Sequence, residues 1–313
     1  MLGYAARRLA MAVPVVIVVA ILTYFLIQLV GGSPAGAILG PNATQEQIAS
    51  LEKQLGVDRP VLDRFFTWMT GAVQGDLGKS FLDNRSVTSK VAAALPPTLS
   101  LALVATLLTL VLGLVLGMLA AVRGGRADRI VQWMCNLGMA VPNFWLAAVL
   151  ILVFALQFGI FPVAGYTNLT TSPAEWLWHL VLPALALSLS SLGQIAFQAR
   201  AAVRDALTRD YVRTLHATGV PRSRILYKHV LRNAAVPVVT VTGLTFIFTL
   251  GGVVVLELIF GMSGMGILML NSVQGSDYGV VLGIVVVFAL MVVIVNLIVD
   301  LVIAALDPRV RVR

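Results

Sequence analysis

Long apolar segments separated by short polar stretches dominate this sequence. Six segments have about the 20 apolar residues that a membrane-spanning helix needs. They are Leu9–Val30, Thr98–Val122, Val131–Gln157, Trp176–Gln198, Ala235–Leu256 and Gly279–Leu306. The first follows Arg7 and Arg8, but its apolar run is longer than that of a signal peptide, so we expect an uncleaved helix. The pattern predicts an all-α polytopic membrane protein with six transmembrane helices.

The composition agrees with a membrane protein. Hydrophobic residues make up 59% of the chain and charged residues 12%, and the mean hydropathy is +0.94. A soluble domain would carry about twice that share of charged residues. The single Cys135 lies in an apolar run and the three histidines are scattered. We therefore expect no disulfide framework and no metal site.

The positions of the basic residues predict the orientation of the chain. Of the 22 Lys and Arg residues, 16 lie at the N-terminus, in segments 123–130 and 200–233, and in the tail 307–313. The other six lie in residues 31–97, where six acids balance them. Basic loops stay in the cytosol. We expect both termini to be cytosolic and residues 31–97 to form an extracytoplasmic cap; this arrangement also explains the net charge of +8 without nucleic acid.

Within the cap, residues 31–42 are rich in turn formers, while Thr44–Leu55 and Val61–Val73 have the spacing of amphipathic helices. The segment Gly75–Ser80 reads Gly-Asp-Leu-Gly-Lys-Ser and looks like the end of a phosphate-binding loop. Position 73 is Val where that motif needs Gly, and no strand is expected before it. We expect a solvated turn here.

The segment 200–233 is the longest basic stretch between two apolar segments. It carries eight Lys and Arg residues against Asp205 and Asp210. Asp210 suits an N-cap, Gly219 suits the αL residue that ends a helix, and Pro221 suits the first turn of the next helix. The pattern predicts a short helix, a turn and a second helix, held parallel to the membrane as a cytosolic hairpin on which a partner docks.

Two spans carry polar stripes. Ser188, Ser191, Gln194 and Gln198 share a face of the fourth span, and Thr242, Thr245 and Thr249 share a face of the fifth. One interpretation is a water-accessible path, with Ser191, Gln194, Thr245 and Thr249 as candidate lining residues. The alternative is that hydroxyl groups bond to their own backbone, or that small residues allow close helix packing.

Glu257 and Asp300 lie in or beside apolar segments, where an ionised carboxylate is costly. Proton coupling is one hypothesis for them. The other is structural, because both lie near helix ends, which water or arginine can reach. Neither has a second acid, His or Lys in its own span with which to form a proton relay.

Short motifs in order along nearly the whole chain resemble the permease subunits of bacterial ABC importers, specifically the first of the two permeases in dipeptide, oligopeptide and nickel systems. They are Leu55–Pro60, Gly75–Ser80, Leu95–Leu99, Pro142–Trp145, Leu182–Leu185, Asp210–Thr214, Glu257–Phe260, Gly264–Gly266, Asp277–Tyr278, Asn296, Asp300 and Asp307–Arg309.

The resemblance implies a type I ABC importer permease fold in the bacterial cytoplasmic membrane. Residues 1–30 would hold the first helix, 31–97 the cap, 98–306 the five-helix core with the hairpin 200–233, and 307–313 the basic tail. The hairpin would act as a coupling helix on a cytosolic ATPase. Its docking residues would be Tyr211, Arg213, Thr214, Leu215, His216, Ala217, Thr218, Gly219 and Val220. Arg213-Thr214-Leu215 stand where the family has Glu-Ala-Ala.

The resemblance also implies the partners. These are a second, homologous permease, one or two ATPase subunits or a fused ATPase, and an extracytoplasmic substrate-binding protein. ATP and Mg²⁺ would be bound by the ATPases, and this chain would hold no cofactor and have no enzymatic activity. The cargo would be di- or oligopeptides, with nickel, glutathione or haem as alternatives. A proton-coupled secondary transporter and a membrane-embedded protease are competing hypotheses; we find no internal repeat for the first and no catalytic set in the spans for the second.

Overall fold

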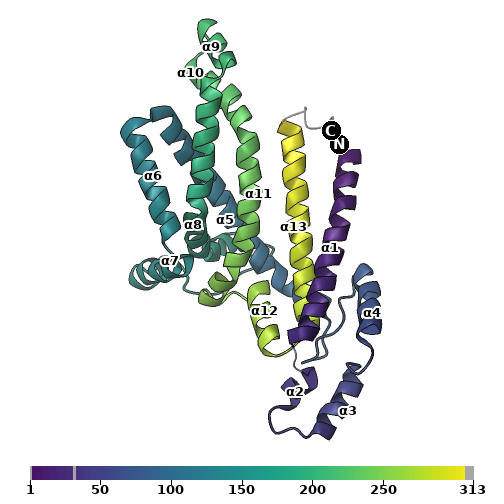
Figure 1. Cartoon of the computed structure of the whole chain (residues 1–313). Helices are drawn as coiled ribbons and strands as arrows, with labels where there is room; N and C mark the ends of the chain where they lie inside the picture. Colours follow the sequence, from purple (N-terminus) through teal and green to yellow (C-terminus); the bar gives the residue numbers. More distant parts are fainter. Residues whose placement is uncertain (1, 31–32, 307–313) are drawn as a thin grey trace. The chain divides into compact units, whose positions relative to one another are not determined.

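The computed structural model describes residues 2–30 and 33–306, so the predicted basic tail at 307–313 lies outside the described residues. The chain forms helices in this order (Figure 1): α1 (Leu2–Val30), α2 (Pro34–Leu39), α3 (Gln45–Leu55), α4 (Val61–Val73), α5 (Val87–Arg123), α6 (Gly125–Ala140), α7 (Asn143–Leu150), the π-helical η1 (Ile151–Gln157), α8 (Pro173–Thr208), α9 (Asp210–Ala217), α10 (Arg222–Arg224), the π-helical η2 (Ile225–Val230), α11 (Leu231–Ile259), α12 (Met265–Gln274) and α13 (Tyr278–Leu306). The expected all-α class is confirmed.

Five helical stretches among the described residues are long and apolar enough to cross a membrane, and a sixth span results if a bent helix pair is counted as one. The sequence pattern predicts a single helix for the third span, Val131–Gln157, and this prediction is wrong, because the structure has the bent pair there. Gly125–Ala140 and Asn143–Gln157 meet at 96°. Val141 is extended, with φ −85° and ψ 124°, a conformation that the ring of Pro142 favours because it disfavours helical geometry in the residue before it. α7 accordingly runs across the direction of α6 (Figure 1).

The described residues divide into two compact units. The first, here called the core unit, contains residues 2–6, 99–262 and 294–306; the second, the cap unit, contains residues 7–30, 33–98 and 263–293. In the core unit, α5 approaches α8 at two glycines one helical turn apart. A Cβ atom at Gly113 would lie 2.8 Å from Cβ of Ile195, and one at Gly117 would lie 2.5 Å from the carbonyl oxygen of Ala196. Only glycine allows the two backbones to come this close.

The cap unit confirms two predicted helices and corrects two boundaries. α3 begins after Thr44, whose side chain forms a capping box with Gln47, and α4 has the predicted bounds. Residues 34–39, expected as turns, form the short helix α2. Residues 87–97, expected to belong to the cap loop, are instead the first turns of α5, which continues through Pro96 and Pro97.

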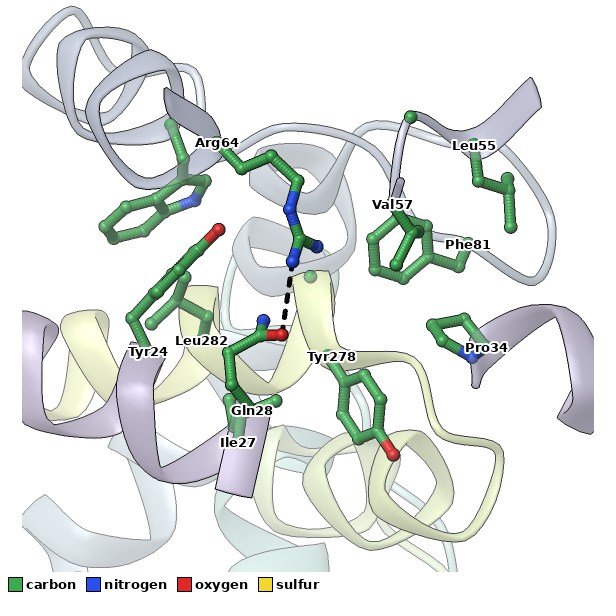
Figure 2. Close-up of a pocket in the computed structure, with 13 residues that line it drawn as sticks. Tyr24, Ile27, Gln28, Pro34, Leu55, Val57, Arg64, Phe81, Tyr278 and Leu282 are labelled. Carbon is green, nitrogen blue, oxygen red and sulfur yellow. Dashed lines mark hydrogen bonds between the residues drawn. The ribbon is translucent and has the colours of Figure 1, made fainter. Parts of the chain in front are cut away.

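Aromatic side chains form the centre of the cap unit. Tyr24 of α1 and Phe65 of α4 meet edge to face with ring centroids 5.1 Å apart, and Leu282 of α13 is buried against them. The apolar face of α4 therefore packs against α1 and the first turns of α13. Beside this cluster lies a cavity of about 190 Å³ (Figure 2).

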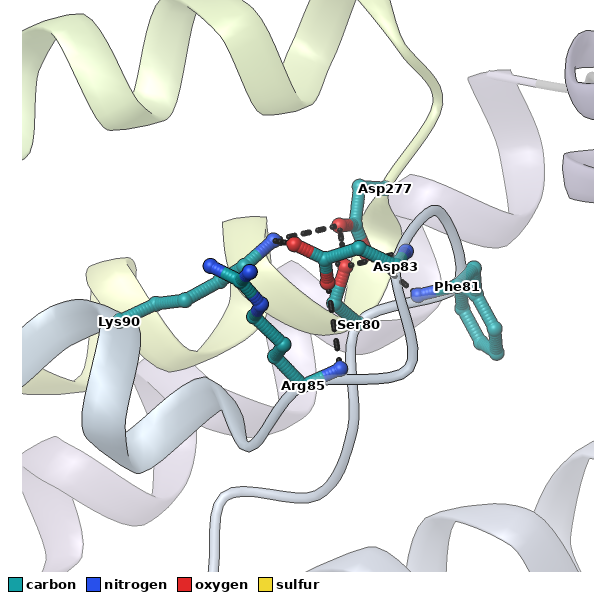
Figure 3. A network of polar contacts seen from close by, with 6 residues as sticks. All are labelled: Ser80, Phe81, Asp83, Arg85, Lys90 and Asp277. Atoms are coloured by element: carbon teal, nitrogen blue, oxygen red, sulfur yellow. Dashed lines mark hydrogen bonds and ion pairs between the residues drawn. The ribbon is translucent and has the colours of Figure 1, made fainter.

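A polar network joins residues about 200 positions apart within the cap unit (Figure 3). The hydroxyl of Ser80 donates to the buried carboxylate of Asp277, and the Phe81 amide donates to the same carboxylate at 3.0 Å. Lys90 donates to Ser80 Oγ at 3.0 Å and pairs with Asp83 at 2.9 Å. Ser80 is only 3% exposed. The expectation of a solvated turn is therefore wrong at Ser80, which fastens this turn to the residue before α13.

Gly117→Ala tests the close approach of α5 and α8. The added methyl group would collide with backbone atoms of α8, so we expect a loss of about 2 kcal/mol in the free energy of unfolding, measured by thermal unfolding in detergent. Gly251→Ala is the matched control, because nothing lies within 4 Å of a Cβ there. Equal unfolding temperatures for the two variants would contradict the close approach.

The Asp83–Lys90 pair predicts a pH dependence. Burial raises the pKa of the Asp83 carboxyl, but the Lys90 ammonium and the Arg85 amide, which both donate to it, lower the pKa by more, from 3.8 to about 2. A lowered pKa stabilises the fold above the ordinary value, and this contribution disappears as the pH falls from about 4 towards 2.

We therefore expect wild type to exceed Asp83→Asn in stability by up to about 1 kcal/mol above pH 4, since the pair is partly exposed. The difference in unfolding temperature between the two should shrink towards zero near pH 2. A difference that stays constant between pH 6 and pH 2 would show that the Asp83 charge does not act here.

Candidate functional site

The predicted hairpin lies between the ends of α8 and α11 in the core unit (Figure 1). Residues 200–208, expected in the hairpin, are the last turns of α8. The predicted short helix exists as α9, and Gly219 has the predicted left-handed conformation, with φ +75°. The second helix of the hairpin is not separate, because α10, η2 and α11 form one continuous helical stretch from Arg222 to Ile259. One long helix, α8, thus ends just before α9, and a second long helical stretch begins just after it.

The predicted cap of α9 is wrong in one detail. Arg209 occupies the N-cap position without a side-chain hydrogen bond, and Asp210 is the first helical residue. The Asp210 carboxylate forms an ion pair with Nη1 of Arg213 at 3.5 Å, and both side chains are almost fully exposed. An acid in the first turn still suits the helix dipole, so Asp210 favours this helix start without capping it.

α9 has one buried and one exposed side. Val212 is buried, and Tyr211, Leu215 and Val220 pack against an apolar cluster formed by Val203, Ala206, Ile225, Val230 and Ala234. The remaining residues of the predicted docking set are exposed: Arg213, Thr214, His216, Ala217, Thr218 and Gly219. The structure therefore brings the whole set together and divides it into an anchoring side and an accessible side.

A carboxylate on α6 holds the end of α8 that leads into α9. Asp128 accepts hydrogen bonds from Nη2 of Arg200 at 2.7 Å, from Nη2 of Arg204 at 2.8 Å and from Nε2 of Gln132 at 2.9 Å. Nε of Arg200 donates to Oδ1, the oxygen that also accepts from Gln132, while both Nη2 atoms donate to Oδ2. The Asp128 side chain is 12% exposed. Such bidentate, charge-assisted contacts are among the strong ones in proteins, so they fix α6 to α8 near the hairpin.

Sequence reasoning missed this contact because it counted Arg200 and Arg204 only as positive charges. One signal was present. Asp128 is the single acid in the basic segment 123–130, and the two arginines are four residues apart, which places them on one helical face.

The candidate pathway residues lie on α8 and α11 in the core unit, and they differ in exposure. Thr245 is 1% exposed and Thr249 is 5% exposed. The Thr245 hydroxyl donates to the carbonyl of Val241 at 2.9 Å, as in the backbone-bonding alternative. Ser191 is half-buried and Gln194 is exposed. A role in the pathway remains a prediction for these residues, and Gln194 has the most accessible side chain of the four.

The two candidate acids also differ. Glu257 lies in the last turn of α11 and is fully buried, whereas Asp300 of α13 is half-buried. Their functional role remains a prediction. Among residues 2–30 and 33–306, no group of three or more His, Cys, Asp or Glu side chains could hold a metal ion.

Asp128→Asn tests the contact between α6 and α8. The amide keeps the shape but loses the charge and accepts fewer hydrogen bonds, so we expect about 2 kcal/mol less stability in thermal unfolding. Asp205→Asn is the control, because the Asp205–Arg209 pair is exposed and its loss should change little. Equal effects of the two substitutions would contradict a structural role for Asp128.

Comparison with known proteins identifies related chains. Residues 113–312 match the family described as "Binding-protein-dependent transport system inner membrane component", and residues 1–102 match the N-terminal part of such membrane components. A relative in Brucella abortus (strain 2308), whose name describes it as a peptide transport system permease protein, is 38% identical and the match covers 97% of this chain and 98% of the relative.

Two further similarities extend the comparison. The glutathione transport system permease protein GsiC of Escherichia coli (strain K12) is 36% identical over 99% of both chains. An inward-facing structure of the MetNI methionine ABC transporter shares the fold with a TM-score of 0.55, at 17% identity, covering 69% of this chain and 96% of that one. The chain belongs to the family of binding-protein-dependent transport system inner membrane components, the membrane permeases of ABC importers.

Proposed function

We propose that this permease carries di- or oligopeptides into the cell and that α9 is its coupling helix. ATP hydrolysis in such importers belongs to separate nucleotide-binding subunits, so this chain is not itself an enzyme. The observation that carries the coupling proposal is the division of α9 into a buried apolar side and an exposed polar side, at the junction of two long helices.

The proposed coupling is mechanical. A partner ATPase that binds the exposed side of α9 would move α9 together with the ends of α8 and α11, because Val212 and its neighbours anchor α9 to both helices. The Asp128 contact would pass this movement to α6. ATP-driven closure of the partners then shifts the population between inward-open and outward-open states, because the contacts at α9 differ between those states.

The proposed orientation rests on charge. The segment around α9 and both termini carry most of the Lys and Arg residues, as cytosolic segments do. α9 would then face cytosolic ATPases that bind ATP and Mg²⁺, and the predicted cap at residues 31–97 would face an extracytoplasmic substrate-binding protein. A second, homologous permease would complete the pathway.

Peptides are the proposed cargo because the relatives that bear peptide names match this chain over nearly its full length. Glutathione is the second candidate, since GsiC is almost as similar. Glutathione is itself a small peptide, so both candidates belong to one chemical class. Proton coupling through Glu257 or Asp300 is disfavoured by membership of an ATP-driven family.

Ala217→Trp tests the coupling role of α9. Ala217 is exposed at the end of α9, so the large ring should leave the fold intact but block a docked partner. We expect roughly tenfold less ATPase to co-purify with the tagged permease from its native membrane, and uptake of a labelled dipeptide by the cells should fall in parallel.

Ala49→Trp on the exposed surface of α3 is the matched control for docking at α9 and should co-purify with as much ATPase as wild type. Normal ATPase recovery with Ala217→Trp would contradict docking at α9. Competition of unlabelled glutathione with dipeptide uptake, measured on wild type, separates the two cargo candidates.

A further inference from the structure

A cavity of about 190 Å³ in the cap unit combines aromatic walls with one cation (Figure 2). It lies where the end of α1, α4, the loop at Phe81 and the start of α13 meet. Tyr24, Trp68, Phe81 and Tyr278 form much of its wall, and Arg64 and Gln28 supply its polar groups. Cavities that bind small molecules have this composition, with mostly apolar walls and a few polar groups that orient the ligand.

The Arg64 side chain has fewer partners than a half-buried guanidinium requires. Its Nη2 donates to the neutral Gln28 amide at 3.2 Å. Its Nε is buried and, within the described part of the chain, has no hydrogen-bond partner. No carboxylate among the described residues lies at ion-pair distance from Arg64. Asp63 and Asp76 line an adjacent, more polar hollow, which Arg64 also lines.

An unpaired donor and an uncompensated charge in a partly apolar place are both costly. An anion in the cavity would remove both costs. The planar guanidinium matches a carboxylate, which can accept two parallel hydrogen bonds from it. Figure 2 shows the guanidinium between the Tyr24 hydroxyl and the Phe81 ring, so a bound carboxylate would have the aromatic walls beside it.

We propose that this cavity is a carboxylate-binding site that takes a single carboxylate with a short apolar or aromatic substituent. Its volume leaves room for a group the size of one amino-acid side chain. The carboxylate has two possible sources, a free small acid or an Asp or Glu side chain of a protein that docks on the cap unit. The proposal goes beyond the transport function, and its failure would leave that function untouched.

The test is equilibrium dialysis of the full chain, purified in lipid nanodiscs, against radiolabelled benzoate and, separately, benzyl alcohol. We expect saturable binding of one benzoate per chain and no comparable binding of the alcohol, which has the ring but no charge. Arg64→Gln should weaken benzoate binding at least tenfold. Arg59→Gln, which removes an exposed cation outside this cavity, should bind like wild type.

Equal binding of benzoate by wild type and Arg64→Gln, or equal binding of acid and alcohol by wild type, would overturn the proposal. Arg64→Lys is a second variant in case Arg64→Gln does not fold, because it keeps the charge but loses the planar guanidinium. Its affinity for benzoate should lie between those of wild type and Arg64→Gln. Unfolding temperatures of all variants show which of them are folded.

Competition identifies the source of the carboxylate. Displacement of benzoate by a dipeptide, but not by the same dipeptide with an amidated C-terminus, assigns the site to a free acid. Displacement by a binding protein that co-purifies with the transporter, and not by the dipeptide, assigns it to an acidic side chain on that protein. Either result supports a carboxylate site.

Discussion

The pairing of Asp128 with Arg200 and Arg204 is the interaction on which the proposed coupling region depends. A carboxylate with so little exposure must be compensated, and here two guanidinium groups and an amide bond its two oxygens. The apolar cluster under α9 holds α9 to α8 and α11 without direction, because hydrophobic contacts are not directional. The Asp128 contacts add direction, since they fix which face of α8 is turned towards α6.

Local patterns predicted local structure well. The capping box at Thr44, the bounds of α4 and the αL conformation of Gly219 all depend on residues within a few positions of each other. Pro142 is a local signal for the break after α6, but the apolar residues on both sides of it led to the prediction of a single span. Hydropathy counts apolar residues and does not detect where a proline divides them.

Long-range polar pairs could not be predicted in the same way. Ser80 and Asp277 are 197 positions apart, and Asp128 and Arg200 are 72 apart. Each residue alone resembles an ordinary loop or cytosolic polar residue, and only the fold brings it to its partner. The same holds for Arg64, whose significance depends on the cavity beside it and on the acids that lie elsewhere.

The unbroken length of α8 has a mechanical consequence. At about 1.5 Å per residue, its 36 residues form a rod roughly 54 Å long. A tilt of only about 5° about the Pro173 end would carry the other end through about 5 Å, nearly one helical turn. Since Asp128 of α6 binds Arg200 and Arg204 near the Thr208 end of α8, α6 would move together with that end. If α8 moves as a rigid rod, a displacement of several ångströms at α9 would correspond to a rotation of only a few degrees and to little displacement near Pro173.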